Sequence, residues 1–345
     1  MTSPMADEKH GRAPSETVAR SITTDGASKQ GWVHPRALWA GPRALWAGPR
    51  GHWAEPRGHW AERLIRARAR SKGFESRWVD TSLGRLHAFE AKGTGALGRI
   101  IAIHGLGSGG MPFVRTLQAL RATFGSVCVL ESPGHGFSEA PKDPLTPESW
   151  LACVHEALDT LLLGSERATL LGNSLGGALS MQYALRQPER LDRMILCSPA
   201  GAPLTTLEHT ALRSTFAIVT LADARRFIDR LMARSPLWGP LVAPEIRRRL
   251  TKPALMEFFE RLEPGHFLSA EDLGALTTPT LILWGEGDRI LPRSAFEWFT
   301  HNAPPSLTCE IMPGVGHCPQ IERPAHLARR ITAFVSESHP PGESR

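Results

Sequence analysis

Long apolar runs are absent from this sequence of 345 residues, although 41% of its residues are hydrophobic. No stretch approaches the roughly 18 consecutive apolar residues that indicate a transmembrane helix. The N-terminus also lacks the charged segment followed by an apolar segment that is typical of a secretory signal. We therefore expect no membrane span and no signal peptide, in a chain that can form one large domain.

Patterns that bind metals or nucleotides are missing as well. The histidines and cysteines do not have the spacing of zinc ligands, and no Walker-type glycine loop occurs. We therefore predict no metal and no cofactor.

The cysteines form no CxxC pair. They are an odd set of five, namely Cys128, Cys153, Cys197, Cys309 and Cys318. Cys128 and Cys197 lie in apolar runs that are typical of buried strands. Reduced, buried thiols in a cytoplasmic protein account for this pattern.

Positive charge is unevenly distributed along the chain, whose formal net charge is +6. Residues 1–72 contain 13 Lys and Arg against 6 Asp and Glu, whereas residues 73–345 contain 27 against 28. A neutral body lacks the electrostatic surface that nucleic acids require. We therefore expect no nucleic-acid partner.

The N-terminal part contains tandem heptads at residues 29–63, which hold five of the ten tryptophans. The units read KQGWVHP, RALWAGP, RALWAGP, RGHWAEP and RGHWAER. Proline at the end of the first four units excludes a coiled coil. We interpret residues 1–72 as a disordered tail, with a short basic helix at 63–72 leading into the body. Docking on a partner or on an anionic surface is the alternative role for the repeats.

From residue 77 onward, strands and helices alternate. The alternation of apolar and polar residues around Gly84 predicts a hairpin of edge strands, and RIIAIHG (99–105) predicts a buried parallel strand. The segment 146–164 predicts a helix with Thr146 as its cap. Further strands are predicted at ATLLGNS, RMILCSP, TLILWGE and LTCEIMPG, with a helix at 175–186.

Strand patterns are missing between Ala202 and Glu271, where amphipathic helical segments follow one another. We predict a helical lid over residues 202–271, inserted between two core segments at 73–201 and 272–338, and a flexible C-terminus at 339–345. The apolar lid residues that could line a pocket are Phe216, Phe227, Leu231, Met232, Leu237, Trp238, Phe258, Phe259 and Phe267.

Ser174, in the sequence LLGNSLGG, has the setting of a nucleophile. Gly172 and Gly176 flank it at the GxSxG spacing, directly after an apolar strand and before a helix. A sharp strand-to-helix turn leaves no room for side chains at the flanking positions and exposes the hydroxyl at a helix N-terminus. Ser174 is therefore the candidate nucleophile.

This chain resembles the α/β-hydrolase family from about residue 77 onward, because several motifs arrive in that family's order. HGLGSGG (104–110) follows a buried strand, and ESPGHGFSE (131–139) is similar to the family's D-x-P-G-x-G-x-S segment, with glutamate in place of aspartate. The resemblance implies an α/β-hydrolase fold, with a mostly parallel central sheet, helices on both faces and a lid inserted between strands. It also implies that the backbone amides of Leu106 and Leu175 form the oxyanion hole.

A nucleophilic serine needs a base, and the base needs a carboxylate to orient it. TLILWGEGDRILP places Asp288 just past a buried strand, and EIMPGVGHCPQIERP places His317 on a glycine-rich loop past the next. The order Ser, Asp, His is that of the family. Glu286 is the competing carboxylate, but the family's G-x-x-D pattern falls on Asp288.

We therefore expect a serine hydrolase that cleaves carboxylic esters, or related acyl bonds, of small to medium apolar small-molecule substrates through an acyl-enzyme. Carbon–carbon bond hydrolysis of meta-cleavage products is an alternative, in which Arg225 or Arg226 of the lid would bind a substrate carboxylate. Acyl transfer and a non-enzymatic ligand-binding role also stay open. No pattern indicates the natural substrate, its binding residues or the oligomeric state.

Overall fold

The computed structural model describes residues 59–141, 145–163, 167–251 and 258–337. All of these belong to one unit, residues 31–345. Residues 1–58, with nearly all of the heptads, lie outside the described ranges, as does the predicted C-terminal segment. The elements in chain order are α1 (His59–Arg70), β1 (Glu75–Thr81), β2 (Gly84–Lys92), β3 (Leu97–Ile103), η1 (Met111–Phe113), α2 (Val114–Leu120), β4 (Phe124–Leu130), α3 (Pro147–Leu161), β5 (Ala168–Asn173), α4 (Leu175–Arg186), η2 (Pro188–Arg190), β6 (Leu191–Cys197), α5 (Thr206–Phe216), α6 (Leu221–Leu231), α7 (Gly239–Leu250), η3 (Pro264–His266), α9 (Ala270–Gly274), β7 (Thr280–Gly285), α10 (Arg293–His301), β8 (Leu307–Met312), α11 (Pro319–Glu322) and α12 (Pro324–Glu337).

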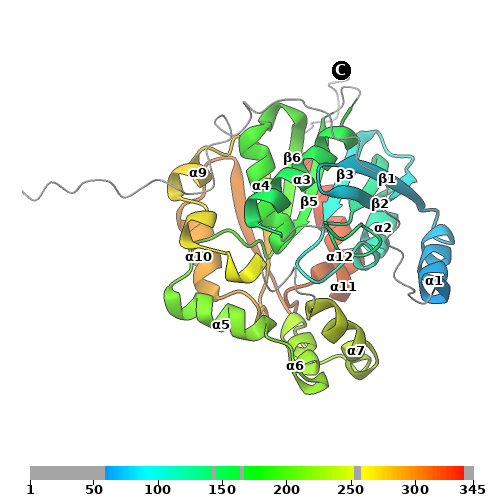
Figure 1. The fold of residues 1–345 in the computed structure, drawn as a ribbon. Coiled ribbons are helices and arrows are strands. Elements are labelled where there is room, and N and C mark those ends of the chain that lie inside the picture. Colours follow the sequence, from blue (N-terminus) through cyan, green and yellow to red (C-terminus); the bar gives the residue numbers. More distant parts are fainter. Residues whose placement is uncertain (1–58, 142–144, 164–166, 252–257, 338–345) are drawn as a thin grey trace, which may run out of the picture. The chain divides into compact units, whose positions relative to one another are not determined.

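Eight strands form one sheet in the order β1-β2-β4-β3-β5-β6-β7-β8 (Figure 1). The β1–β2 and β2–β4 pairs are antiparallel and all the others are parallel. The predicted hairpin is the β1–β2 pair, which turns at Gly84 with a φ of 113°, a backbone angle that favours glycine. Of these two strands, only β1 is an edge strand, because β2 also pairs with β4. The prediction of a mostly parallel sheet is confirmed.

Neighbouring residues of the central strands are buried on opposite faces of the sheet. In β3, Ile101 and Ile103 belong to the core that includes α3, α4 and α10. Ile100 and Ala102 belong to a second core, with α2 and α12. A strand covered on both faces has no polar side to present, which explains its continuous apolar run. Helices therefore cover both faces of the sheet, as predicted.

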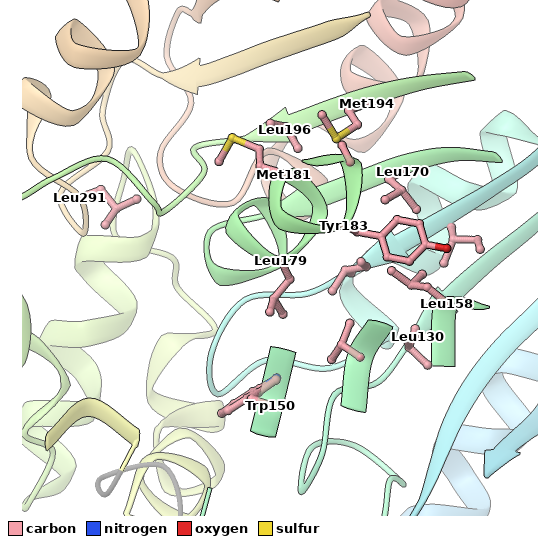
Figure 2. Close-up of a cluster of buried hydrophobic side chains, with 14 of the residues drawn as sticks. Leu130, Trp150, Leu158, Leu170, Leu179, Met181, Tyr183, Met194, Leu196 and Leu291 are labelled. Atoms are coloured by element: carbon pink, nitrogen blue, oxygen red, sulfur yellow. The ribbon is translucent and has the colours of Figure 1, made fainter. Parts of the chain in front are cut away.

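The helix predicted at 146–164 is α3. Thr146 accepts a hydrogen bond from the Ser149 amide, and Ser149 accepts one from the Thr146 amide, so the helix begins with a capping box. Trp150 and Leu158 of α3 join Tyr183 of α4 in one buried apolar cluster (Figure 2). This cluster fixes α4, the helix that begins directly after Ser174.

Ordered structure begins before the predicted boundary at residue 72. The predicted basic helix at 63–72 corresponds to the second half of α1 (His59–Arg70), in which Ala69 is fully buried. The guanidinium of Arg66 lies 4.5 Å from the ring centroid of Phe137, a cation–π contact that stabilises the helix on the body. Three of its arginines, Arg63, Arg68 and Arg70, are exposed, so its composition resembled that of a disordered tail.

The described residues between β6 and β7 form helices and no strand. Figure 1 shows α5, α6 and α7 gathered on one side of the sheet, beside α10 and α11. The carbonyl of Leu231, at the end of α6, accepts a hydrogen bond from the His317 amide at 2.8 Å. The insertion thus contacts the loop that follows β8, at the carboxyl ends of the parallel strands. Within the described ranges, no helix is long and apolar enough to cross a membrane.

Candidate active site

Ser174 occupies the sharp turn between β5 and α4. Its backbone angles, φ 53° and ψ −121°, lie in a region that residues other than glycine rarely adopt. The turn is held because the Ser174 amide donates to the carbonyl of Cys197 at 3.1 Å, while the Ser174 carbonyl accepts from the Ala200 amide at 3.0 Å. The strained geometry is therefore imposed by the end of β6 and by the loop that follows it.

Close backbone packing explains the glycines beside Ser174. A Cβ atom on Gly176 would lie 2.1 Å from the carbonyl oxygen of Ile103, and one on Gly172 would lie 2.6 Å from the carbonyl oxygen of Gly176. Neither approach is possible without moving backbone. The GxSxG pattern is thus a steric requirement of this turn.

Asp288 and His317 come together from the loops after β7 and β8. His317 Nδ1 lies 2.7 Å from Asp288 Oδ2, and both side chains are buried. Asp288 Oδ1 accepts hydrogen bonds from the amides of Ile290 and Leu291, at 2.8 and 3.1 Å. Burial alone would raise the pKa of Asp288, but the nearby His317 and these hydrogen bonds outweigh it and hold that pKa below its ordinary value. Asp288 is therefore a carboxylate, so His317 donates from Nδ1 and its Nε2 is left as an acceptor.

The competing carboxylate of Glu286 has a different environment. Its side chain is exposed, and Oε2 accepts the Gly314 amide at 2.9 Å. The structure thus brings Asp288 to His317, while Glu286 shapes the loop that carries the histidine.

Asn173, which sequence reasoning missed, ties the serine turn to the histidine loop. Its Nδ2 donates to the carbonyls of Cys197 and His317, at 2.9 and 3.0 Å, and its Oδ1 accepts from Gln320 Nε2 at 2.9 Å. Asn173 is 2% exposed. Because His317 and Gln320 lie far along the chain, nothing in the local sequence signals these contacts.

Glu322, also missed, holds the other side of the histidine loop. Oε1 accepts the Gly316 amide at 2.7 Å, and Oε2 accepts the Ala233 amide at 2.8 Å. One carboxylate thereby joins the loop of His317 to the helical insertion.

The predicted oxyanion loop, residues 104–110, passes close to Ser174. A Cβ atom on Gly105 would lie 3.1 Å from Ser174 Cβ. The amides of Leu106 and Leu175 make no hydrogen bond within the described part of the chain. Both residues line the same cavity as Ser174. Two unengaged backbone donors therefore lie beside the serine.

Two histidines fasten this loop to the segment 131–138. The Ser132 amide donates to His104 Nε2 at 3.0 Å, and the Gly107 amide donates to His135 Nε2 at 2.9 Å. Each ring must present a neutral acceptor nitrogen. Burial lowers the pKa of His104, which is consistent with the neutral form.

Glu131 adds a third fastening, at the position where the resembled motif has aspartate. Its oxygens accept the amides of Gly110 and Phe137, both at 2.8 Å, and Oε2 lies 3.0 Å from His87 Nδ1. Burial alone would raise the pKa of Glu131, but His87 and the two amides hold it below the ordinary value. The buried glutamate therefore remains charged and fixes the end of the loop.

A cavity lies against Ser174, and its volume of about 570 Å³ includes space open to solvent. Among its described lining residues, Ser174 is the only one with a polar side chain. The lining comprises Leu106, Ser174, Leu175, Pro199, Ala200, Gly201, Ala202, Leu204, Leu212, Phe216, Phe258, Phe259, Leu262, Phe267, Ile290, Leu291 and Ala295. Within the described lining, the serine hydroxyl is thus the one reactive group of an apolar chamber.

The residues predicted to line a pocket divide into three groups. Phe216, Phe258, Phe259 and Phe267 do so. Phe227 and Met232 are buried and Leu231 is partly buried, but these three do not line this cavity. The expectation is wrong for Leu237 and Trp238, which are 100% and 41% exposed in the turn between α6 and α7. Amphipathic patterning identifies apolar side chains but not whether a turn faces the cavity or the solvent.

The two arginines of the insertion that were predicted to bind a substrate carboxylate do not line this cavity. Arg225 and Arg226 are exposed on α6, and Arg226 pairs with Asp223. Within the described ranges, no group of three or more His, Cys, Asp or Glu could hold a metal ion. The five cysteines are free thiols, and burial raises the pKa of Cys128 and of Cys197 to about 12.

Comparison with known proteins agrees with this architecture. Residues 100–330 match the sequence model of the Alpha/beta hydrolase family. The 2-hydroxymuconate semialdehyde hydrolase of Pseudomonas putida is 28% identical over 254 residues, which cover 69% of this chain and 87% of that protein. The structure of 2-hydroxy-6-oxo-6-phenylhexa-2,4-dienoate hydrolase from Rhodococcus sp. strain RHA1 has a TM-score of 0.67 at 22% identity, covering 76% of this chain and 99% of its own. Carboxylesterase CesB from Bacillus subtilis has a TM-score of 0.67 at 21% identity, with coverages of 80% and 98%. Because the family match spans more than half of the chain, this protein belongs to the α/β-hydrolase family.

Proposed function

We propose that this protein is a serine hydrolase that cleaves carboxylic esters of small to medium apolar acyl groups. The observation that carries the proposal is the apolar chamber in which Ser174 is the only polar side chain among the described lining residues. Such a chamber favours an apolar acyl group. The polar contacts of the substrate are then limited to its ester carbonyl, at the turn that carries Ser174.

In the first half of the proposed reaction, Ser174 Oγ attacks the ester carbonyl while its proton passes to His317 Nε2. Asp288 keeps the proton of His317 on Nδ1 and stabilises the imidazolium that forms. The amides of Leu106 and Leu175 donate to the oxyanion. Collapse of this intermediate breaks the bond to the alcohol, which leaves with the proton from His317.

The second half releases the acyl group. A water molecule gives its proton to His317 and attacks the acyl-enzyme, the same two amides stabilise the oxyanion, and the protonated His317 returns the proton to Ser174 Oγ as the acid departs. If an alcohol takes the place of water, the product is a new ester, so acyl transfer uses the same residues.

Carbon–carbon bond hydrolysis is the alternative that the relatives support equally well. Two of the proteins compared above carry names of hydrolases that act on 2-hydroxymuconate semialdehyde or on a phenylhexadienoate. A dienoate substrate brings a carboxylate, whereas no charged residue is among the described lining. Arg249 of α7 approaches the carbonyl of Ser108 in the oxyanion loop at 3.4 Å, but its Nε is bound by Glu245 at 2.6 Å. We therefore favour ester cleavage.

The remaining parts of the proposal concern the insertion and the location. We propose that residues 202–271 act as a lid, because Leu204, Leu212, Phe216 and the aromatic residues from Phe258 onward line the chamber. We also propose a cytoplasmic location, in which the five cysteines stay reduced.

The deciding experiment compares kcat/KM for p-nitrophenyl esters, from acetate to laurate, with that for 2-hydroxy-6-oxo-6-phenylhexa-2,4-dienoate. We expect the best ester to exceed the dienoate by at least about 100-fold, and Ser174→Ala to abolish ester cleavage. Preference for the dienoate, with a raised KM in Arg249→Gln, would establish the alternative. If the wild-type protein cleaves neither the esters nor the dienoate but still binds esters, the result would indicate a ligand-binding module.

A further inference from the structure

A second cavity lies on the outer side of the insertion and shares a wall with the chamber at Ser174. It spans about 790 Å³, a volume that includes space open to solvent. Its lining comprises His209, Thr210, Arg213, Ser214, Phe216, Ala217, Phe259 and Glu260. Among the described residues, Phe216 and Phe259 line both cavities.

The two shared rings pack directly on each other. Their centroids are 4.6 Å apart, with planes tilted by 39°. Phe216 also packs on Phe227 at 5.0 Å, and Phe259 on Phe258 at 6.2 Å. Both shared residues are only 7% exposed. The two rings therefore lie buried against each other between the two cavities.

The chemistry of the lining changes across this partition. On the inner side, every described lining residue except Ser174 is apolar. On the outer side, the rings give way to His209, Arg213 and Glu260, with hydroxyl groups of the α5 helix between them. The apolar chamber thus ends at Phe216 and Phe259.

We propose that Phe216 and Phe259 determine the length of the acyl group that this enzyme accepts, by closing the distal end of the chamber against the outer cavity. The inference rests on the proposed function, since it takes the chamber to be the acyl site. An acyl chain that begins at Ser174 and reaches the two rings fills the chamber, and a longer chain meets them. Removing either ring joins the two cavities and lets the chain continue.

The first test measures kcat/KM for p-nitrophenyl butyrate and p-nitrophenyl dodecanoate in the wild type, Phe216→Ala and Phe259→Ala. We expect the dodecanoate-to-butyrate ratio to rise by at least about tenfold in both variants, because the loss of steric exclusion favours only the longer chain. A ratio that stays within about twofold of the wild type in both would overturn the partition.

Phe227 supplies a matched control. It packs on Phe216 but lines neither cavity. Phe227→Ala removes the same number of atoms from the same aromatic cluster. We expect it to leave the ratio within about twofold of the wild type, whereas a rise equal to that of Phe216→Ala and Phe259→Ala would indicate general loosening of the insertion.

A binding experiment separates this inference from the proposed reaction. In the Ser174→Ala background, titration calorimetry with octanoate and dodecanoate reports on the chamber without any chemistry. We expect Phe259→Ala to tighten dodecanoate relative to octanoate by at least about tenfold. If the wild type cleaves no ester and this shift is still found, the partition stands and the proposed function falls. If esters are cleaved and neither ratio moves, the partition falls alone. Should the alanine variants unfold, Phe216→Leu and Phe259→Leu are used in both experiments.

Discussion

Asn173→Ala offers the most quantitative test of how the candidate site is held together. The substitution removes the two hydrogen bonds that Nδ2 donates and the two that Oδ1 accepts, from Gln320 Nε2 and, at 4.0 Å, from Cys318 Sγ. The Cys197 carbonyl keeps the Ser174 amide as a donor, but the His317 carbonyl and the Gln320 side-chain amide lose the partners described above. Each buried polar group left unpaired costs roughly 1–3 kcal/mol, so we expect the free energy of unfolding to fall by about 3 kcal/mol.

The assay is urea unfolding followed by tryptophan fluorescence, with an unchanged m-value as the sign that the two states compared are the same. Ser180→Ala is the control, because Ser180 is also buried, lies in α4 and gives up a single hydrogen bond, to the Gly176 carbonyl at 2.7 Å. We expect the control to cost about 1 kcal/mol. A loss below about 1 kcal/mol for Asn173→Ala would refute the view that this residue joins the serine turn to the histidine loop.

Three further predictions follow from the described contacts. Asp288→Asn should lower kcat for ester cleavage by on the order of 10³- to 10⁴-fold, because an amide no longer selects the form of His317 that carries its proton on Nδ1. Steady-state kinetics measures this loss, and a decrease in kcat of less than about tenfold would contradict the prediction. Glu131→Gln should lower the free energy of unfolding at pH 7 by about 2 kcal/mol. The pKa of Glu131 in the folded protein lies below its ordinary value of 4.5, so the charged side chain stabilises the fold fully above pH 4.5 and loses this effect as the pH falls through the lowered pKa. Urea unfolding curves of the wild type and the variant should therefore converge as the pH is lowered from 7. A difference in unfolding free energy that stays constant with pH would contradict this explanation. Gly176→Ala should fail to yield folded protein because its Cβ would meet the Ile103 carbonyl, whereas Gly274→Ala, with nothing within 4 Å, should leave the melting temperature within a few degrees of the wild type, as circular dichroism can show.

The sequence was informative wherever a residue's neighbours along the chain set its structure. The strands β3 and β5 carry apolar runs because both of their faces are covered, and α4 begins and ends at the predicted residues 175 and 186. The cap at Thr146 was readable for the same reason, since the capping box spans only residues 146–149.

Contacts between distant segments were not readable. The partners of Asn173 and Glu322 lie on loops that only the assembled sheet brings together. The contact of α1 with the body was not readable either, because it rests on Ala69, on the partly buried Ile65 and on the cation–π contact of Arg66, amid exposed arginines. Leu237 and Trp238 show the converse problem, since apolar residues in a helical insertion can also face solvent.

The central claim is that Ser174 is the nucleophile, and intact-mass analysis after incubation with a fluorophosphonate tests it most directly. The account predicts a single phosphonyl adduct on the wild type that maps to the peptide containing Ser174. It also predicts that Ser180→Ala, which removes the nearby buried serine of α4, is labelled as the wild type is, and that Ser174→Ala gains no mass. An unlabelled wild-type protein, or a Ser174→Ala variant that still takes up the label at the wild-type rate, would contradict it.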